Sequence, residues 1–309
     1  MSTQSNNLPE SFSSQPAAPE TLVRTRPFYW SVRRELWEYR SVYLVPLAIA
    51  GVSLFSFLFV MPHLPHMMRA AMVSAPIHYR DRVAHPFEMA AAFILGAMFL
   101  VSIYYAIDCL YGERRDRSIL FWKSLPVSDL TTVLAKATVP LILMPMLAFA
   151  ITLVAESIML LLGIAVIAAN GLSVAAFWQQ LQPFPGMGML LYHLVTVHML
   201  WYAPLYAWLL LVSAWSRRAP FLWAVLPPFA IGIFEKAAFH SSHFATLMMY
   251  RVGGGREAVD SMQGDMPFHP GMHLTPGLFL ATPGLWLGLV FAAAFLIAAA
   301  RIRRDRGPI

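Results

Sequence analysis

Long apolar runs alternate with short polar segments along most of the chain after residue 40. A helix needs about 20 predominantly apolar residues to cross a bilayer. The pattern therefore predicts an all-α polytopic membrane protein with six transmembrane helices, at about 42–60, 86–107, 133–165, 189–215, 219–239 and 278–300. The third run stays apolar to about residue 169, so we expect that span to be tilted or broken. We expect loops at 63–85, 170–187 and 240–276.

Two different segments precede the first run. Residues 1–26 are rich in polar residues and Pro and have no apolar core, which predicts a disordered cytoplasmic tail and not a signal peptide. Residues 27–39 combine Trp, Tyr and Arg, which is typical of an amphipathic helix in the membrane interface. A set of anchors flanking the first span is the alternative. The membrane domain then covers 27–309.

The charge distribution indicates the orientation. Only 12% of the residues are charged and the mean hydropathy is +0.60, whereas soluble domains carry about 25% charged residues. With six spans, both chain ends lie on one side of the membrane. The opposite side receives only six of the 22 Lys and Arg residues, namely Arg69, Arg80, Arg82, Lys236, Arg251 and Arg256. Cytoplasmic loops are the basic ones, so we expect both termini in the cytoplasm. The net charge of +6 then reflects topology, and no nucleic-acid partner is predicted.

Residues 108–129 are the most charged interior segment, and an apolar cluster follows the charges directly. Spacings of three and four place Phe121, Trp122 and Leu125 on one side of a short helix. We expect Pro126 to end this helix and Ser128 to cap the next one. An ordinary basic cytoplasmic loop would explain the charges. It would not explain the exposed aromatic residues, which favour a partner surface or the lipid interface.

The segment 111–128 reads Tyr-Gly-Glu-Arg-Arg-Asp-Arg-Ser-Ile-Leu-Phe-Trp-Lys-Ser-Leu-Pro-Val-Ser and follows an apolar run. It resembles the first cytoplasmic loop of bacterial ABC-2 type transporter permeases. In that family the loop carries a coupling helix that docks on a separate ATPase subunit. The resemblance is specific over this segment and covers the remainder only by the number of spans and the loop layout.

This resemblance implies a permease subunit in the bacterial cytoplasmic membrane that exports an apolar or amphipathic substrate. It also implies an ABC ATPase partner that binds ATP and Mg²⁺, and a homodimer or a heterodimer with a second permease. The residues expected to dock and transmit force are Gly112, Glu113, Arg114, Arg115, Arg117, Phe121, Trp122, Lys123 and Pro126.

Motifs for chemistry within this chain are absent from the sequence. It contains no G-x-x-x-x-G-K-S/T phosphate loop, no H-E-x-x-H zinc motif and no G-x-S-x-G nucleophile elbow. Cys109 is the single cysteine, which excludes a disulfide within the chain. We therefore expect a non-catalytic subunit without a cofactor of its own. Most histidines fall in or beside expected outer loops together with methionines, but their spacing defines no metal site.

Glu156 lies inside the third apolar run. An ionisable residue within a span is a functional candidate, so Glu156 is predicted to line a substrate path or to take up a proton. A position near the outer water boundary and a hydrogen bond to a neighbouring helix are the alternatives. Asp108, at the inner end of the second span, is expected to orient the coupling stretch through its arginines.

Two other function classes fit the sequence less directly. A non-transporting sensor or resistance component for antimicrobial peptides or lipids would work with the same ATPase. A membrane-embedded enzyme would use Glu156 and the outer histidines, and it would need polar groups clustered within several spans. The sequence shows few such groups.

Overall fold

The computed structural model describes residues 26–73, 76–254 and 276–309. Every regular element in these ranges is a helix. The α-helices are α1 (Pro27–Glu38), α2 (Ser41–Val60), α3 (Leu64–Val73), α4 (Pro76–Arg115), α5 (Ile119–Ser124), α6 (Asp129–Thr138), α7 (Met144–Ala169), α8 (Val174–Leu181), α9 (Pro183–His193), α10 (Ala203–Trp215), α11 (Pro220–Phe239), α12 (His243–Val252), α14 (Pro276–Ala281) and α15 (Pro283–Asp305).

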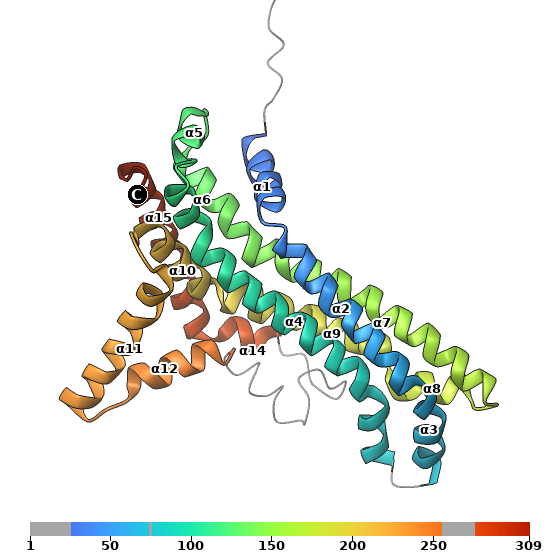
Figure 1. Ribbon diagram of the computed structural model, residues 1–309. Coiled ribbons are helices and arrows are strands. Elements are labelled where there is room, and N and C mark those ends of the chain that lie inside the picture. The colour runs from blue at the N-terminus through green and yellow to red at the C-terminus, as the bar shows by residue number, and fades with distance from the viewer. Residues whose placement is uncertain (1–25, 74–75, 255–275) are drawn as a thin grey trace, which may run out of the picture.

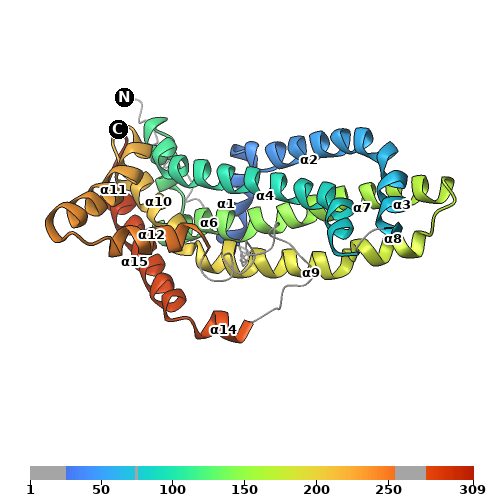
Figure 2. The ribbon, with the colours of Figure 1, turned by 90° about the horizontal axis from the view of Figure 1, so that it is seen from below.

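A long helical bundle forms the body of the protein. Helices α2, α4 and α7 run side by side over most of its length, and α10 packs on α4 and α15 (Figures 1 and 2). The inner face of α4 carries Ile94, Met98 and Tyr105, which are completely buried. Their separations of four and seven residues keep them on one side of the helix, where they face the core shared with α10.

Among the described residues, five helices are long and apolar enough to span a membrane, namely Ser41–Ala70, Val83–Arg115, Asp129–Ala169, Pro220–Phe239 and Pro283–Asp305. A sixth span exists only if Val174–Trp201 and Ala203–Trp215, which meet at 45°, count as one. The prediction of an all-α multi-pass membrane protein is thus confirmed, while the number of six spans is not.

The bend lies at Tyr202, inside the span expected at 189–215. A π-helical segment, η3 (Leu194–Trp201), precedes it, and Pro204 follows within the first turn of α10. A proline removes one backbone donor and disfavours a straight continuation of the helix. The two prolines of the third run act in the same way, because Pro140 lies in a second π segment, η2 (Val139–Leu143), and Pro145 starts α7. That run is helical over 41 residues, longer than the predicted 133–165.

Three expected loops contain helices, so their prediction as loops was wrong. The segment 63–85 holds α3 and the first turns of α4, and 170–187 holds α8 and the start of α9. The segment 240–276 contains α12, although residues 255–275 lie outside the described residues, as does nearly all of the tail expected at 1–26. Short polar stretches with Gly or Pro resembled turns, but neighbouring helices stabilise them as short helices.

Helices α11 and α12 diverge from the bundle (Figure 1). The Glu235 carboxylate joins them, because its two oxygens accept the backbone N–H groups of His243 and Phe244, at 2.8 Å each. These donors are unpaired at the start of any helix. Glu235 therefore caps α12, a role that its adjacency to Lys236 did not suggest.

Candidate functional site

Four helices that are distant in sequence meet at the end of the bundle that carries α5. The last turns of α4 and α15 lie there together with α1 and the start of α6 (Figure 1). The chain end lies there too, since the Ile309 N–H donates to the Arg114 carbonyl oxygen at 3.2 Å. Both described chain ends are thus on the same side of the bundle as the segment 108–129.

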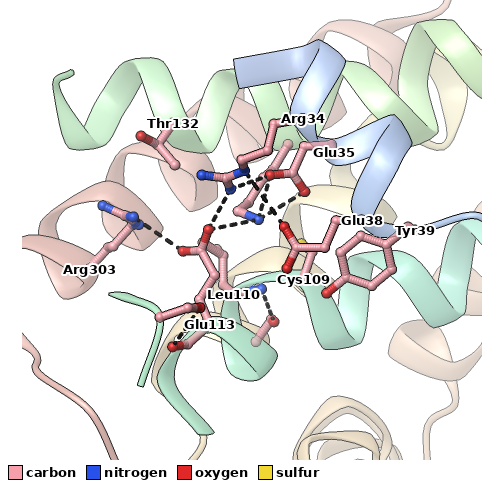
Figure 3. A network of polar contacts seen from close by, with 12 residues as sticks. Arg34, Glu35, Glu38, Tyr39, Cys109, Leu110, Glu113, Thr132 and Arg303 are labelled. Carbon is pink, nitrogen blue, oxygen red and sulfur yellow. Dashed lines mark hydrogen bonds and ion pairs between the residues drawn. The ribbon is translucent and has the colours of Figure 1, made fainter. Parts of the chain in front are cut away.

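Glu113 is the centre of this junction. Its Oε1 accepts from Arg34 Nη2 of α1 at 2.6 Å and lies 3.2 Å from Lys136 Nζ of α6. Its Oε2 accepts from Arg303 Nη2 of α15 at 3.2 Å. Figure 3 shows Glu113 between Arg303 on one side and Arg34 with Glu35 on the other. One carboxylate at the end of α4 therefore binds three other helices.

Glu35 provides the second buried carboxylate. Lys136 Nζ donates to both of its oxygens at 2.9 Å, and the Tyr105 hydroxyl donates to Oε2 at 2.8 Å. Asp129, which is less buried, pairs with Arg303. We call Arg34, Glu35, Glu113, Asp129, Lys136 and Arg303 the ion cluster. It holds three cations and three anions, so its formal charge is zero.

Most side chains of the ion cluster are buried. The side chains of Glu35, Glu113 and Lys136 are 0–1% exposed, and that of Arg303 is 4% exposed. Burial disfavours the charge of Arg34, but Glu35 and Glu113 outweigh this effect and raise its pKa. A buried charge is tolerated when its partners are close and well oriented. The ion cluster therefore connects α1, α4, α6 and α15 through buried ion pairs.

Three of the nine residues predicted to dock and transmit force are buried within this chain. Glu113 belongs to the ion cluster, and Gly112 and Arg114 are also buried. A Cβ on Gly112 would lie 3.3 Å from Asp108 Oδ2 and 3.4 Å from the Tyr39 hydroxyl, so the glycine leaves room for the hydrogen bond that Tyr39 donates to Asp108 at 3.2 Å. Arg114 Nη1 donates to the carbonyl oxygens of Ala214 and Ser216 at 2.6 and 3.0 Å and thereby caps the end of α10.

The other basic residues of the segment differ in their contacts. Arg115 is exposed and lies 3.8 Å from Asp108, which agrees with the expected link between Asp108 and the arginines. Arg117 is exposed, with a φ of +58° in the turn between α4 and α5. Lys123 Nζ donates to the carbonyl oxygens of Arg304 and Arg306, at 3.0 Å each. Lys123 thus holds the chain end against α5.

Helix α5 is short and carries apolar side chains outward. Leu120 and Phe121 are 59% and 60% exposed, and Leu125 is 39% exposed. Trp122 is half-buried because the Arg34 guanidinium covers it, with Cζ 3.8 Å from the ring centroid. We call Leu120, Phe121, Trp122 and Leu125 the α5 patch. Pro126 is exposed just after α5, and the preceding Leu125 is extended, as is usual for a residue before proline. Ser128 caps α6 as predicted, with its Oγ accepting from the Thr131 N–H at 3.0 Å.

The residues that complete the ion cluster were not predicted as site residues. Lys136 offered a signal, since it lies inside an apolar run where an ionisable side chain indicates a functional or paired position. Arg34, Glu35 and Arg303 look like ordinary interfacial or topological charges in the sequence. Only the fold brings them to Glu113.

Glu156 lies far along α7 from the ion cluster and lines a cavity of about 140 Å³ between α4, α7, α8 and α9. Glu88 of α4 lines the same cavity. The structure therefore places Glu156 at a cavity, together with a second acid, Glu88, that the sequence did not single out.

Within the described part of the chain, His198 is buried in the bundle and His193 beside it is half-buried, in contrast to the outer-loop positions expected for most other histidines. The rings of His193 and His198 lie 5.5 Å apart between centroids. Across the described ranges, no three His, Cys, Asp or Glu side chains come together as a metal site would require.

Comparisons of the chain with family models, with curated proteins and with solved structures find no match.

Proposed function

We propose that this protein is the membrane-spanning subunit of an ATP-driven transporter of the ABC-2 type, and that the α5 patch docks a separate ATPase. The observation that carries this proposal is that the exposed apolar helix α5 lies directly beside the buried ion cluster. Leu120 and Phe121 project from α5, while Glu113, six residues earlier than Ile119, anchors three other helices.

The exposure of the α5 patch supports a protein partner. Large aromatic and aliphatic side chains are typical anchors of interfaces, and exposed apolar patches mark interaction sites. The neighbouring Arg115 and Arg117 are exposed as well, and such charges steer an acidic partner surface and set its orientation. The patch lies beyond the ends of the long helices (Figure 1).

The ion cluster provides a way to transmit movement. A force on α5 acts on α4 through a turn of three residues, 116–118, and on α1 through the stacking of Arg34 on Trp122. Glu113 then connects α4 to α6 and α15. Switching between two arrangements of packed helices is a known mode of conformational change. In the proposed mechanism, ATP-driven closure of the partner moves α5 and the ion cluster together.

ATP binding belongs to the partner in this proposal, because the sequence contains no phosphate loop. The asymmetry of Lys and Arg supports a cytoplasmic location for the α5 end, where such a partner is accessible. Two copies of this chain, or one copy with a related permease, would bind two ATPases. The apolar cavity near Glu156 supports an apolar or amphipathic substrate.

Co-purification tests the docking role. A tagged full-length protein is extracted from its native membrane in mild detergent and examined for a bound phosphate-loop ATPase and for vanadate-sensitive ATP hydrolysis. We expect both with the wild type and a loss of at least tenfold with the double variant Leu120→Ala, Phe121→Ala. The matched control is Leu58→Ala, Phe59→Ala on α2, which removes equally exposed side chains. Equal ATPase recovery from both double variants would contradict the proposal.

A further inference from the structure

The cavity beside Glu156 is almost entirely apolar. Its walls come from α4, α7, α8 and α9, with Phe87, Leu160 and Leu190 among the lining residues. The polar side chains in the lining are Glu88, Glu156 and Ser157. The Ser157 hydroxyl donates to the Leu153 carbonyl oxygen at 2.6 Å, so it is engaged by its own helix. The chemistry of the cavity is that of carboxylates in an apolar space.

Three exposed side chains form one margin of the cavity. Leu153, Trp178 and Phe184 line it and are 42%, 37% and 75% exposed. Leu153 belongs to α7. At a rise of 1.5 Å per residue, it lies about 24 Å from Ala169, the last residue of this helix. The margin is therefore exposed on the outer surface of the bundle, on a helix that is long and apolar enough to span a membrane.

Glu156 has an unfavourable charge environment. Burial in the apolar lining is the main effect that disfavours its charge, and the like charge of Glu88 adds to it; no described residue forms an ion pair with Glu156. A carboxylate in an apolar environment is costly unless a cation or a hydrogen-bond donor compensates it. A ligand cation in the cavity would supply that compensation.

The margin also suits a cation. The Trp178 and Phe184 rings meet edge to face, with centroids 5.6 Å apart. Aromatic faces attract organic ammonium groups, and a cage of aromatic and acidic residues is a common way to bind them. Glu156, Trp178 and Phe184 line the same cavity from three helices, α7, α8 and α9.

The volume restricts the ligand class. A cavity of about 150 Å³ holds a benzene molecule in another protein, so 140 Å³ accommodates one compact group. A divalent metal ion would require six or more oxygen ligands at about 2.0–2.6 Å, which this lining does not offer. A small alkylammonium group fits the volume and the charge, and its chain would leave through the open margin.

We propose that this cavity binds an amphipathic monovalent cation, with the ammonium group at Glu156 beside Trp178 and Phe184 and the apolar chain directed to the bilayer. Binding itself does not depend on an ATPase. The role of the cation as the transported substrate rests on the function proposed above.

Equilibrium binding of radiolabelled decyltrimethylammonium to the full-length protein in nanodiscs tests the site, after subtraction of uptake by empty nanodiscs. We expect saturable binding by the wild type and at least tenfold weaker binding by Glu156→Gln. Asp305→Asn is the matched control, since it removes one exposed carboxylate far from the cavity. Ser157→Phe, which fills the cavity and retains the acid, should also weaken binding at least tenfold.

A neutral competitor separates charge recognition from simple partitioning. 2,2-Dimethyldodecane replaces the ammonium nitrogen by carbon and should not displace the labelled cation from the wild type. Equal affinity of wild type and Glu156→Gln, or complete displacement by the neutral competitor, would overturn the proposal and indicate a lipid-chain site.

Co-purification of the ATPase with the same variants distinguishes the two proposals. Loss of cation binding with retained ATPase binding is expected for Glu156→Gln. If the wild type binds the cation but no ATPase, the transporter function fails while the binding site stands.

Discussion

The guanidinium of Arg34 lies over the Trp122 ring, with Cζ 3.8 Å from its centroid. These residues belong to α1 and α5, which are separated by two long helical segments in the sequence. Arg34 also pairs with Glu113 at 2.6 Å. One side chain therefore connects the exposed helix α5 to the buried ion cluster, and the aromatic residue predicted as a docking anchor also has a structural role.

The stacking of Arg34 on Trp122 can be measured with a double-mutant cycle. Trp122→Leu, Arg34→Met and the double variant are compared by unfolding in mixed micelles. Cation–π pairs contribute about 0.5–2 kcal/mol, so we expect a coupling energy in that range. Phe121→Leu is the control for Trp122→Leu and should show no coupling to Arg34→Met. A coupling energy near zero for both pairs would contradict the contact.

Glu113 should be the most sensitive acid at the α5 end. Glu113→Gln removes one carboxylate shared by Arg34, Lys136 and Arg303, so that Glu35 and Asp129 alone must compensate three largely buried cations. Breaking a buried ion pair costs about 3–5 kcal/mol, which we expect to appear as a lower free energy of unfolding. Asp116→Asn, which affects only an exposed pair with Arg115, should change it by less than about 1 kcal/mol.

A second substitution tests whether unpaired charge causes the loss. Adding Lys136→Met to Glu113→Gln removes one buried cation and supplies a flexible apolar side chain. The double variant should be more stable than Glu113→Gln alone. Additive losses would show that the charges act independently.

Arg251 connects α12 to the bundle, and the missing side chain at Gly288 leaves room for its guanidinium. Its guanidinium donates to the carbonyl oxygens of Trp201 and Gly284 at 3.2 and 2.9 Å. A Cβ on Gly288 would lie 1.7 Å from Arg251 Nη2, whereas one on Gly284 would meet its nearest atom at 3.6 Å. The guanidinium would have to leave this position and lose both hydrogen bonds, and a hydrogen bond of a charged group contributes about 1.5–3 kcal/mol. Gly288→Ala should destabilise the protein by this amount, and Gly284→Ala should not.

Combining substitutions of Arg251 and Gly288 tests whether the guanidinium is the reason for the glycine. In an Arg251→Ala background the clash is absent, so Gly288→Ala should then have little further effect. Thermal unfolding of the four variants in one detergent measures both results. A full additional loss in that background would show that the glycine is required for another reason.

The orientation can be determined by labelling in intact cells. Single cysteines replace Ser124, the last residue of α5, or Gln179 in α8, both exposed, in a Cys109→Ser background where the native thiol is buried. With the α5 end in the cytoplasm, an impermeant maleimide should label position 179 directly and position 124 only after permeabilisation. The reverse pattern would invert the proposed topology.

The sequence by itself determined the class of the protein and most of the long helices. A bilayer crossing requires about 20 apolar residues, so hydropathy alone indicated the spans Val83–Arg115, Pro220–Phe239 and Pro283–Asp305 to within a few turns. The N-cap at Ser128 was equally predictable, because a cap depends on residues close in sequence. Short helices such as α8 were missed, since their stability depends on packing against the bundle.

Only the tertiary structure decided which charges are buried. Within 108–129, Glu113 and Arg115 are both charged residues at the end of a span, and their local context does not distinguish them. Glu113 is buried because Arg34, Lys136 and Arg303 approach it from other helices, whereas Arg115 faces outward. The free energy of a buried charge depends on partners that compensate it, and these partners are far away in the sequence. For the same reason the sequence identified Glu156 as an intramembrane acid, and the fold alone placed it with Trp178 and Phe184 at one cavity.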